Sequence, residues 1–179
     1  MRLPDRLVAI DRALADAGFE HAFGGAIALA YWTFDPRGTS DIDVNVFIPA
    51  ARCEEALAVL PKGIEWSERD IAAIRRNGQA RIWWNETPVD LFFDYVDLHA
   101  AAARNRRIVP FEGVEIPVLG PVELATFKAM FDRTRDWADI EAMLEAETLD
   151  VAAVKANIVA LVGAQDPRLE RLADAATRT

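Results

Sequence analysis

The chain has 179 residues, a net charge of −9 at pH 7 and one cysteine, Cys53. Its hydrophobic fraction of 52% and charged fraction of 27% indicate a globular protein and exclude a disordered or fibrous one. One cysteine excludes an internal disulfide, and no apolar run reaches the roughly 20 residues of a membrane span. No secretory leader is recognisable either, so we expect a cytoplasmic protein without a membrane partner. Any metal should be a hard cation held by carboxylates, because Cys53 and two histidines make a poor zinc site.

The first 120 residues alternate between helical and extended patterns. Helices are predicted over 4–17, 26–32, 49–60 and 97–106. Strands are predicted over 20–23, 41–48, 80–85, 88–95, 107–111 and 114–118, with a tight turn near Glu86-Thr87. The segment 67–76 fits either a short helix or an ordered loop. From Pro121 onward the pattern is helical, over 121–132, 136–146, 150–162 and 167–177.

This order predicts a fold of the α/β (α+β) class. We expect a small mixed β-sheet flanked by helices in residues 1–120, which would form the catalytic domain. We expect residues 121–179 to form a C-terminal helical region packed on it.

The strand predicted over 41–48 carries two acidic residues on one face. Its even-numbered residues are apolar, which places Asp41 and Asp43 together on the opposite face, with Cα atoms roughly 6.5–7 Å apart. Two like charges held this close raise each other's pKa and lower stability unless a cation joins them. A solvated strand face is the alternative interpretation of this pair.

A third carboxylate, Asp90, lies in the apolar strand predicted over 88–95. If the two strands pair, Asp90 lies about 5 Å from one member of the first pair. Three carboxylates at that distance suit one or two divalent ions, and two metal ions about 3.5–4 Å apart stabilise the entering and leaving oxygens of a displacement at phosphorus. Asp94 has the same parity and is the alternative third ligand. Asp90 is preferred because it lies deeper among apolar neighbours.

Two glycines, Gly24 and Gly25, separate a short extended segment from a predicted helix. Glycine permits positive φ and lets backbone N–H groups approach an anion, and a helix start adds a positive dipole. A simple tight turn is the other interpretation. Arg37, Thr39 and Ser40 come just before the aspartate pair, so polar and basic groups surround it in sequence.

Three segments together resemble the nucleotidyltransferase superfamily typified by DNA polymerase beta: Gly24-Gly25, Arg37-Gly38-Thr39-Ser40-Asp41-Ile42-Asp43-Val44 and Val89-Asp90-Leu91-Phe92. The resemblance implies a nucleotidyltransferase fold and transfer of a nucleoside monophosphate from a Mg²⁺-bound nucleoside triphosphate, with release of pyrophosphate. It also implies a metal set of Asp41, Asp43 and Asp90, and a nucleotide-binding set of Gly24, Gly25, Arg37, Thr39 and Ser40.

A further segment narrows the resemblance. Leu119-Gly120-Pro121-Val122-Glu123-Leu124 leads into Lys128, Arg133, Arg135-Asp136 and Asp139, which looks like the Lys-then-Arg-Asp motif of AbiEii and MenT-type nucleotidyltransferase toxins. In that group Lys128 is expected to hold the triphosphate, and Asp136 or Asp139 to support the site. The alternative is two ordinary surface ion pairs at i,i+4 spacing, Lys128 with Asp132 and Arg135 with Asp139.

The expected mechanism assigns Asp41 and Asp43 to both Mg²⁺ ions and Asp90 to the ion nearer the acceptor. That ion and Asp90 lower the pKa of the acceptor hydroxyl so that it attacks the α-phosphate. The catalytic set is therefore Asp41, Asp43, Asp90 and Lys128. Lys128, Ser40 and the glycine amides would bind the leaving pyrophosphate.

The resemblance to the toxins favours a toxin of a toxin–antitoxin pair that modifies tRNA; an aminoglycoside acceptor and no acceptor at all are the alternatives. A toxin acting on tRNA needs a basic surface, for which the candidates are Arg75, Arg76, Arg81, Arg104, Arg106 and Arg107, with Trp83 or Trp84 stacking a base. The toxin group also implies a partner antitoxin that phosphorylates Thr39 or Ser40. An aminoglycoside is cationic and suits an acidic chain. A degenerate domain that only binds a nucleotide or a protein is the third alternative.

Overall fold

The computed structural model describes residues 1–178, which form two compact units. The first unit comprises Met1–Ile27 and Gly38–Leu119. The second comprises Ala28–Arg37 and the described residues from Gly120 onward. The chain therefore leaves the first unit in the middle of one helix and returns to it after ten residues.

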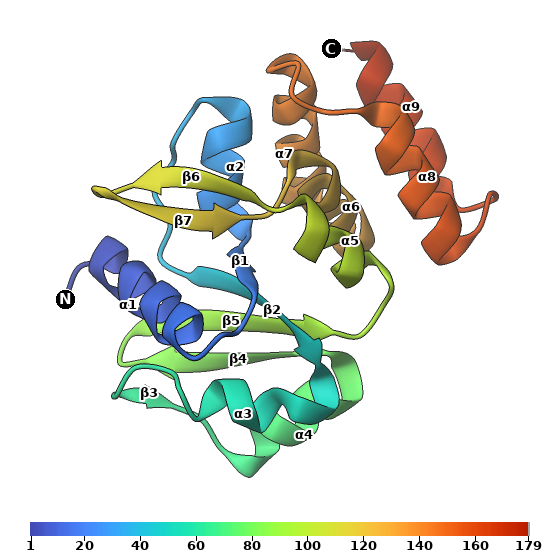
Figure 1. The fold of residues 1–179 in the computed structure, drawn as a ribbon. Coiled ribbons are helices and arrows are strands. Elements are labelled where there is room, and N and C mark those ends of the chain that lie inside the picture. The colour runs from blue at the N-terminus through green and yellow to red at the C-terminus, as the bar shows by residue number, and fades with distance from the viewer. Residues whose placement is uncertain (179) are drawn as a thin grey trace. The chain divides into compact units, whose positions relative to one another are not determined.

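The first unit is built around one seven-stranded sheet (Figure 1). Its strands are β1 (His21–Phe23), β2 (Ile42–Pro49), β3 (Ile64–Glu65), β4 (Gln79–Trp84), β5 (Thr87–Asp94), β6 (Arg107–Phe111) and β7 (Val114–Val118). They lie in the order β3-β4-β5-β2-β1-β7-β6. The pairs β2/β5 and β1/β7 are parallel and the other pairs antiparallel. The predicted mixed sheet flanked by helices is confirmed.

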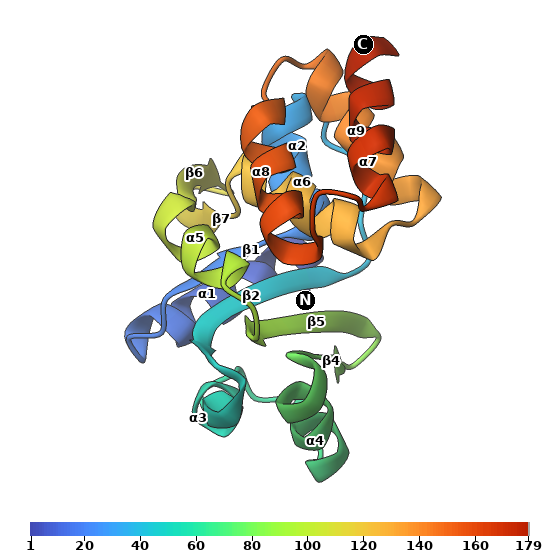
Figure 2. The ribbon, with the colours of Figure 1, turned by 90° about the vertical axis from the view of Figure 1, so that its right-hand side faces the viewer.

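Helices of the first unit pack against this sheet and bury apolar side chains. They are α1 (Leu3–Asp16), the 3-10 turn η1 (Ala50–Arg52), α3 (Cys53–Leu57), α4 (Glu68–Asn77) and α5 (Leu98–Asn105). Figure 2 shows α3 and α4 together below β2, β4 and β5. Alternate residues of the two central strands are almost fully buried: Ile42, Val44, Val46, Val89, Leu91 and Phe93. The alternation in the sequence therefore marks the buried face correctly.

The segment 67–76, for which both a short helix and an ordered loop were considered, forms the helix α4. Ser67 and Asp70 form a capping box at its start, with the Ser67 N–H donating to Asp70 Oδ2 at 2.8 Å. Gly78 ends it in the left-handed conformation. Both ends thus carry the local signals that favour a helix.

Two local predictions are wrong. The helix predicted over 49–60 is shorter and is divided into η1 and α3: Pro49 still belongs to β2, and α3 ends at Leu57. The turn of the β4–β5 hairpin lies at Asn85-Glu86, one residue earlier than predicted, since Thr87 already pairs with Trp84. The two-residue strand β3 was not predicted.

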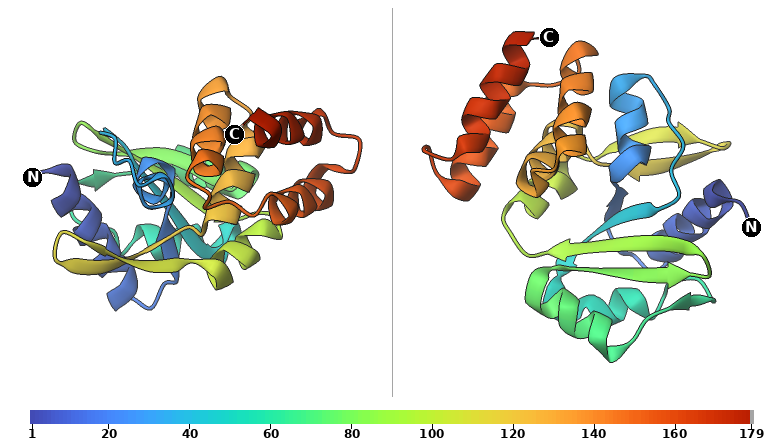
Figure 3. Two further views of the ribbon diagram at one scale, coloured as in Figure 1. Left: turned by 90° about the horizontal axis from the view of Figure 1, so that it is seen from above. Right: turned by 180° about the vertical axis from the view of Figure 1, so that it is seen from behind.

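The second unit is helical. It contains α2 (Gly25–Thr33) from Ala28 on, together with α6 (Pro121–Phe131), α7 (Thr134–Glu145), α8 (Val151–Val162) and α9 (Pro167–Arg178). Helices α8 and α9 lie side by side (Figure 3). The four helices predicted after residue 120 are therefore present. No helix within residues 1–178 is long and apolar enough to cross a membrane.

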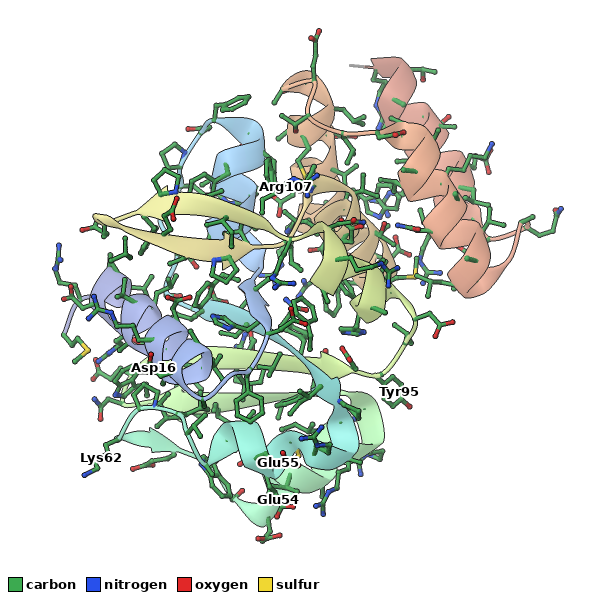
Figure 4. All side chains as sticks on the ribbon, in the orientation of Figure 1. Asp16, Glu54, Glu55, Lys62, Tyr95 and Arg107 are labelled. Carbon is green, nitrogen blue, oxygen red and sulfur yellow. The ribbon has the colours of Figure 1, made fainter. Side chains whose placement is uncertain are left out.

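Gly78 yields a stability prediction. Its φ is 73°, and a Cβ there would lie 2.5 Å from Tyr95 Cβ at the end of β5 (Figure 4). Gly78→Ala should combine the left-handed penalty of about 1–2 kcal/mol with a steric clash. Gly113→Ala is the matched control, because its φ is 82° and nothing lies within 4 Å of an added Cβ. In urea unfolding, Gly78→Ala should lose at least about 1 kcal/mol more than the control. Equal losses would contradict the clash.

Candidate functional site

Two of the three predicted metal ligands, Asp43 and Asp90, lie on neighbouring strands of the first unit, and Asp41 comes just before the first of these strands. Strands β2 and β5 pair in parallel, with Asp43 opposite Asp90. Asp41 comes two residues before Asp43 and shares its parity. Like charges directly opposite on adjacent strands are destabilising. The register therefore creates a concentration of negative charge on the face turned away from the buried apolar residues.

A cation from the third strand lies on this cluster. Arg81 of β4 is the register partner of Asp90 and binds it with two hydrogen bonds, Nε–Oδ1 at 2.7 Å and Nη2–Oδ2 at 2.6 Å. Its Nη2 is also 3.8 Å from Asp41 Oδ2. The hydrogen bond with Asp90 raises the pKa of Arg81 above its ordinary value, and the charges of Asp90, Asp41 and Asp43 raise it further.

Sequence reasoning assigned Arg81 to a surface for RNA and missed this contact. The register of the β4–β5 hairpin could have indicated this contact. With a two-residue turn, Trp84 faces Thr87, and three steps further along Arg81 faces Asp90. The predicted β4–β5 turn lies one residue later than the observed one, so the prediction does not pair Arg81 with Asp90.

The segment before β2 holds the side chain of Asp41. Thr39 Oγ1 donates to Asp41 Oδ1 at 2.5 Å, and the Asp41 N–H donates to Thr39 Oγ1 at 3.4 Å. Thr39 is half-buried by this contact, whereas Ser40 is exposed. The hydroxyl groups of Thr39 and Ser40 therefore have different surroundings.

The glycine pair packs against Asp43. Gly25 has a φ of 50°, and a Cβ on it would overlap Asp43 Oδ2. The Gly24 N–H donates to the Asp43 carbonyl oxygen at 2.9 Å, and a Cβ on Gly24 would lie 3.2 Å from Asn45 Nδ2. Gly25 is therefore required so that the Asp43 carboxylate lies against the first residue of α2, where the helix dipole is positive.

The donor set fits a hard divalent cation by its chemistry. Carboxylate oxygens are the protein ligands that Mg²⁺ prefers, and a cationic group of the chain already lies within 4 Å of two of the three aspartates. Among residues 1–178, no three histidine, cysteine, aspartate or glutamate side chains are already gathered to chelate one ion. Asp90 is turned onto Arg81 instead, with both of its oxygens in hydrogen bonds.

Asp94, the alternative third ligand, lies elsewhere on β5. It pairs with Pro49 across an irregularity in the ladder, whereas Asp90 faces Asp43. Its Oδ1 is buried and has no hydrogen-bond partner in the described part of the chain. Burial raises the pKa of Asp94, and the charge of His99 opposes that shift. The structure thus brings Asp90, and not Asp94, beside the aspartates of β2.

The remaining predicted residues form a cluster inside the second unit. Lys128 Nζ is 2.6 Å from Asp139 Oδ2 and 4.0 Å from Asp136 Oδ1. Arg37 Nη2 is 2.7 Å from Asp139 Oδ1, and Arg133 Nε is 2.5 Å from Asp136 Oδ2. The Lys128 and Asp139 side chains are only 9% and 4% exposed. Both candidate aspartates therefore contact Lys128, and a contact of Lys128 with phosphate stays a prediction.

The alternative of two surface ion pairs at i,i+4 spacing is wrong. Lys128 pairs with a residue 11 positions away, because α6 and α7 pack against each other. Asp132 instead accepts a hydrogen bond from Trp137 Nε1 at 2.6 Å. Arg135 is exposed and forms no ion pair within residues 1–178.

This buried pair yields a second prediction. Lys128→Met removes the cation and leaves Asp139 buried with only the half-exposed Arg37. Because breaking one side of a buried pair strands a charge, the free energy of unfolding should fall by about 3 kcal/mol. Arg135→Gln, on the same pair of helices, should change it by less than about 0.5 kcal/mol. Equilibrium unfolding in urea measures both. A loss below about 1 kcal/mol for Lys128→Met would contradict the buried pair.

No known protein family matches the sequence, and no curated protein is significantly similar to it. The structure resembles that of the antibiotic-resistance factor ANT(2'')-Ia, with a TM-score of 0.61, 10% sequence identity, and coverage of 88% of this chain and 89% of that chain. It also resembles a candidate nucleotidyltransferase from H. pylori, with a TM-score of 0.50, 14% identity, and coverage of 97% and 89%. These likenesses show that the chain has the fold of the nucleotidyltransferases.

Proposed function

We propose that this chain transfers a nucleoside monophosphate from a nucleoside triphosphate to a hydroxyl group of an acceptor. The observation that carries the proposal is the parallel register of β2 and β5, which sets Asp90 beside Asp43 on a sheet with the nucleotidyltransferase fold. Asp41, Asp43 and Asp90 would hold Mg²⁺, which stabilises charge on the phosphates and acidifies the acceptor hydroxyl.

Side-chain and backbone groups of the chain would take the proton of the acceptor hydroxyl and bind the phosphates. Asp90 would take the proton of the acceptor hydroxyl, because it lies on β5, whereas Asp43 packs against the start of α2, where the phosphates would bind. The exposed Ser40 hydroxyl and the amide at the start of α2 would bind phosphate oxygens. The Gly24 N–H is already donated to Asp43, so Gly24 would serve close packing and not phosphate binding.

A small cationic acceptor, of the aminoglycoside type, fits the charges best. The chain carries a net charge of −9. Three of the six arginines considered for a tRNA surface are engaged with carboxylates: Arg75 with Glu54, Arg81 with Asp90 and Arg106 with Glu20. The fold likeness to an antibiotic-resistance factor adds support.

The second candidate is a toxin of a toxin–antitoxin pair that modifies tRNA. One observation favours it: Trp83 is 47% exposed on β4 beside Arg81, where it is free to stack on a base, while Trp84 is buried. Under this alternative, a cognate antitoxin that phosphorylates the site would meet Ser40 more readily than Thr39, because only Ser40 is exposed.

The catalytic prediction concerns Asp43. Asp43→Asn should lower transfer of label from an α-³²P nucleoside triphosphate by at least about 10²-fold, because it removes a charge from the centre of the cluster. The fold should survive, since the substitution also relieves like-charge repulsion. Asp16→Asn on the exposed surface of α1 is the matched control and should retain full activity (Figure 4). Full activity of Asp43→Asn in a folded protein would refute the assignment.

The acceptor prediction uses the same label. The enzyme is incubated with Mg²⁺, each labelled triphosphate and either total tRNA or a panel of aminoglycosides, with Asp43→Asn as the blank. We expect label on the cationic small molecules and none on RNA, because the chain is acidic and half of its candidate RNA-binding arginines are paired. Label on tRNA, together with growth arrest on expression, would overturn this choice in favour of the toxin.

A further inference from the structure

The carboxylate cluster holds a cation supplied by the chain itself. Arg81 binds both oxygens of Asp90 and lies 3.8 Å from Asp41. We propose that Arg81 is a resident counter-cation that holds Asp90 when no divalent ion is bound and must release it for a divalent ion to bind. The inference rests on the proposed function, because it assumes that these aspartates are the metal ligands.

The two cations compete for Asp90 on geometric grounds. The guanidinium fork takes both carboxylate oxygens at 2.6–2.7 Å. A Mg²⁺ ion binds a carboxylate oxygen at about 2.0–2.1 Å and demands near-octahedral geometry, so it would lie within a few ångströms of the guanidinium carbon. Two positive groups at that separation repel strongly outside bulk water. Binding of one therefore weakens the hold of the other on Asp90.

The Arg81 side chain can move away from Asp90 without a change in the backbone of the sheet. Its side chain is 50% exposed, so the guanidinium has solvent to move into. The next residue of β4, Ile82, is 1% exposed and anchors the backbone on the opposite face. The Asp90 side chain is 17% exposed and the contact is bidentate, so the fork holds more firmly than an ordinary surface ion pair, and the divalent ion must supply the energy that opens it. Only the side chain needs to move.

If a divalent ion takes the place of Arg81 at Asp90, substitution of Arg81 should lower the stability of the metal-free protein and raise its affinity for the metal. Without a metal, Arg81 offsets the repulsion of carboxylates that the β2–β5 register forces together. Removing it should lower the stability of the metal-free protein. The same change removes the competitor for Asp90 and should strengthen metal binding. A residue with a merely structural role would lower stability without raising metal affinity.

The experiment measures Mn²⁺ binding to the full chain, from the electron paramagnetic resonance signal of free Mn²⁺ and from calorimetric titration. Arg81→Gln should bind Mn²⁺ at least about fivefold more tightly than the wild type, because fivefold is the affinity equivalent of one exposed ion pair and this contact is bidentate and partly buried. Arg81→Lys keeps the charge and loses the fork, so its affinity should fall in between. Arg69→Gln, an exposed arginine of α4 without an ion pair in the described residues, is the matched control and should bind as the wild type does.

The outcomes separate this proposal from the proposed function. Equal or weaker Mn²⁺ binding by a folded Arg81→Gln protein would overturn the role of Arg81. If Asp43→Asn still abolished Mn²⁺ binding in that case, nucleotidyl transfer at these aspartates would stand. No Mn²⁺ binding by either the wild type or Arg81→Gln would overturn both. The melting temperature gives an independent reading, because added Mn²⁺ should raise it more in Arg81→Gln than in the wild type.

Discussion

The pairing of β2 with β5 is the constraint on which the rest of the site depends. One face of these strands is apolar, and its side chains, such as Ile42, Val44, Val89 and Leu91, are almost completely buried. Burial of each such side chain contributes roughly 1.5–3 kcal/mol, whereas a cross-strand pair of like charges costs on the order of 1 kcal/mol. A slip by one residue would expose the whole apolar set, so the register is decided on the buried face. Proximity of Asp43 and Asp90 follows as a consequence.

The charged face is then arranged to tolerate that proximity. Each of the three aspartates has its own positive or donating group: the guanidinium of Arg81 for Asp90, the hydroxyl of Thr39 for Asp41, and the start of α2 for Asp43. Gly25 makes the last contact possible, because any Cβ would occupy the position of the carboxylate. The glycine pair thus serves the aspartates directly, in addition to any role with phosphate.

Alternation and turn residues were enough to predict the sheet, the helical region after residue 120 and the parity of the three aspartates. Contacts that depend on pairing were beyond this reasoning. The fork between Arg81 and Asp90 required the correct position of the β4–β5 turn, and the pair of Lys128 with Asp139 required the packing of α6 on α7. The helical segment after Pro49 begins later than predicted for a similar reason, since the ladder to β5 retains Pro49 in the sheet.

The chain contains two clusters of opposite charges, and their burial suits them to different tasks. Lys128 and Asp139 are less than a tenth exposed, and separating them would leave charges buried without partners at a cost of about 3–5 kcal/mol. Arg81 is half exposed, so opening its contact with Asp90 returns the guanidinium to water and strands no buried cation. Exchange of one cation for another during a reaction requires a contact of the second kind. The contact of Arg81 with Asp90 is therefore the one suited to exchange, whereas the buried Lys128–Asp139 pair is suited to holding α6 against α7.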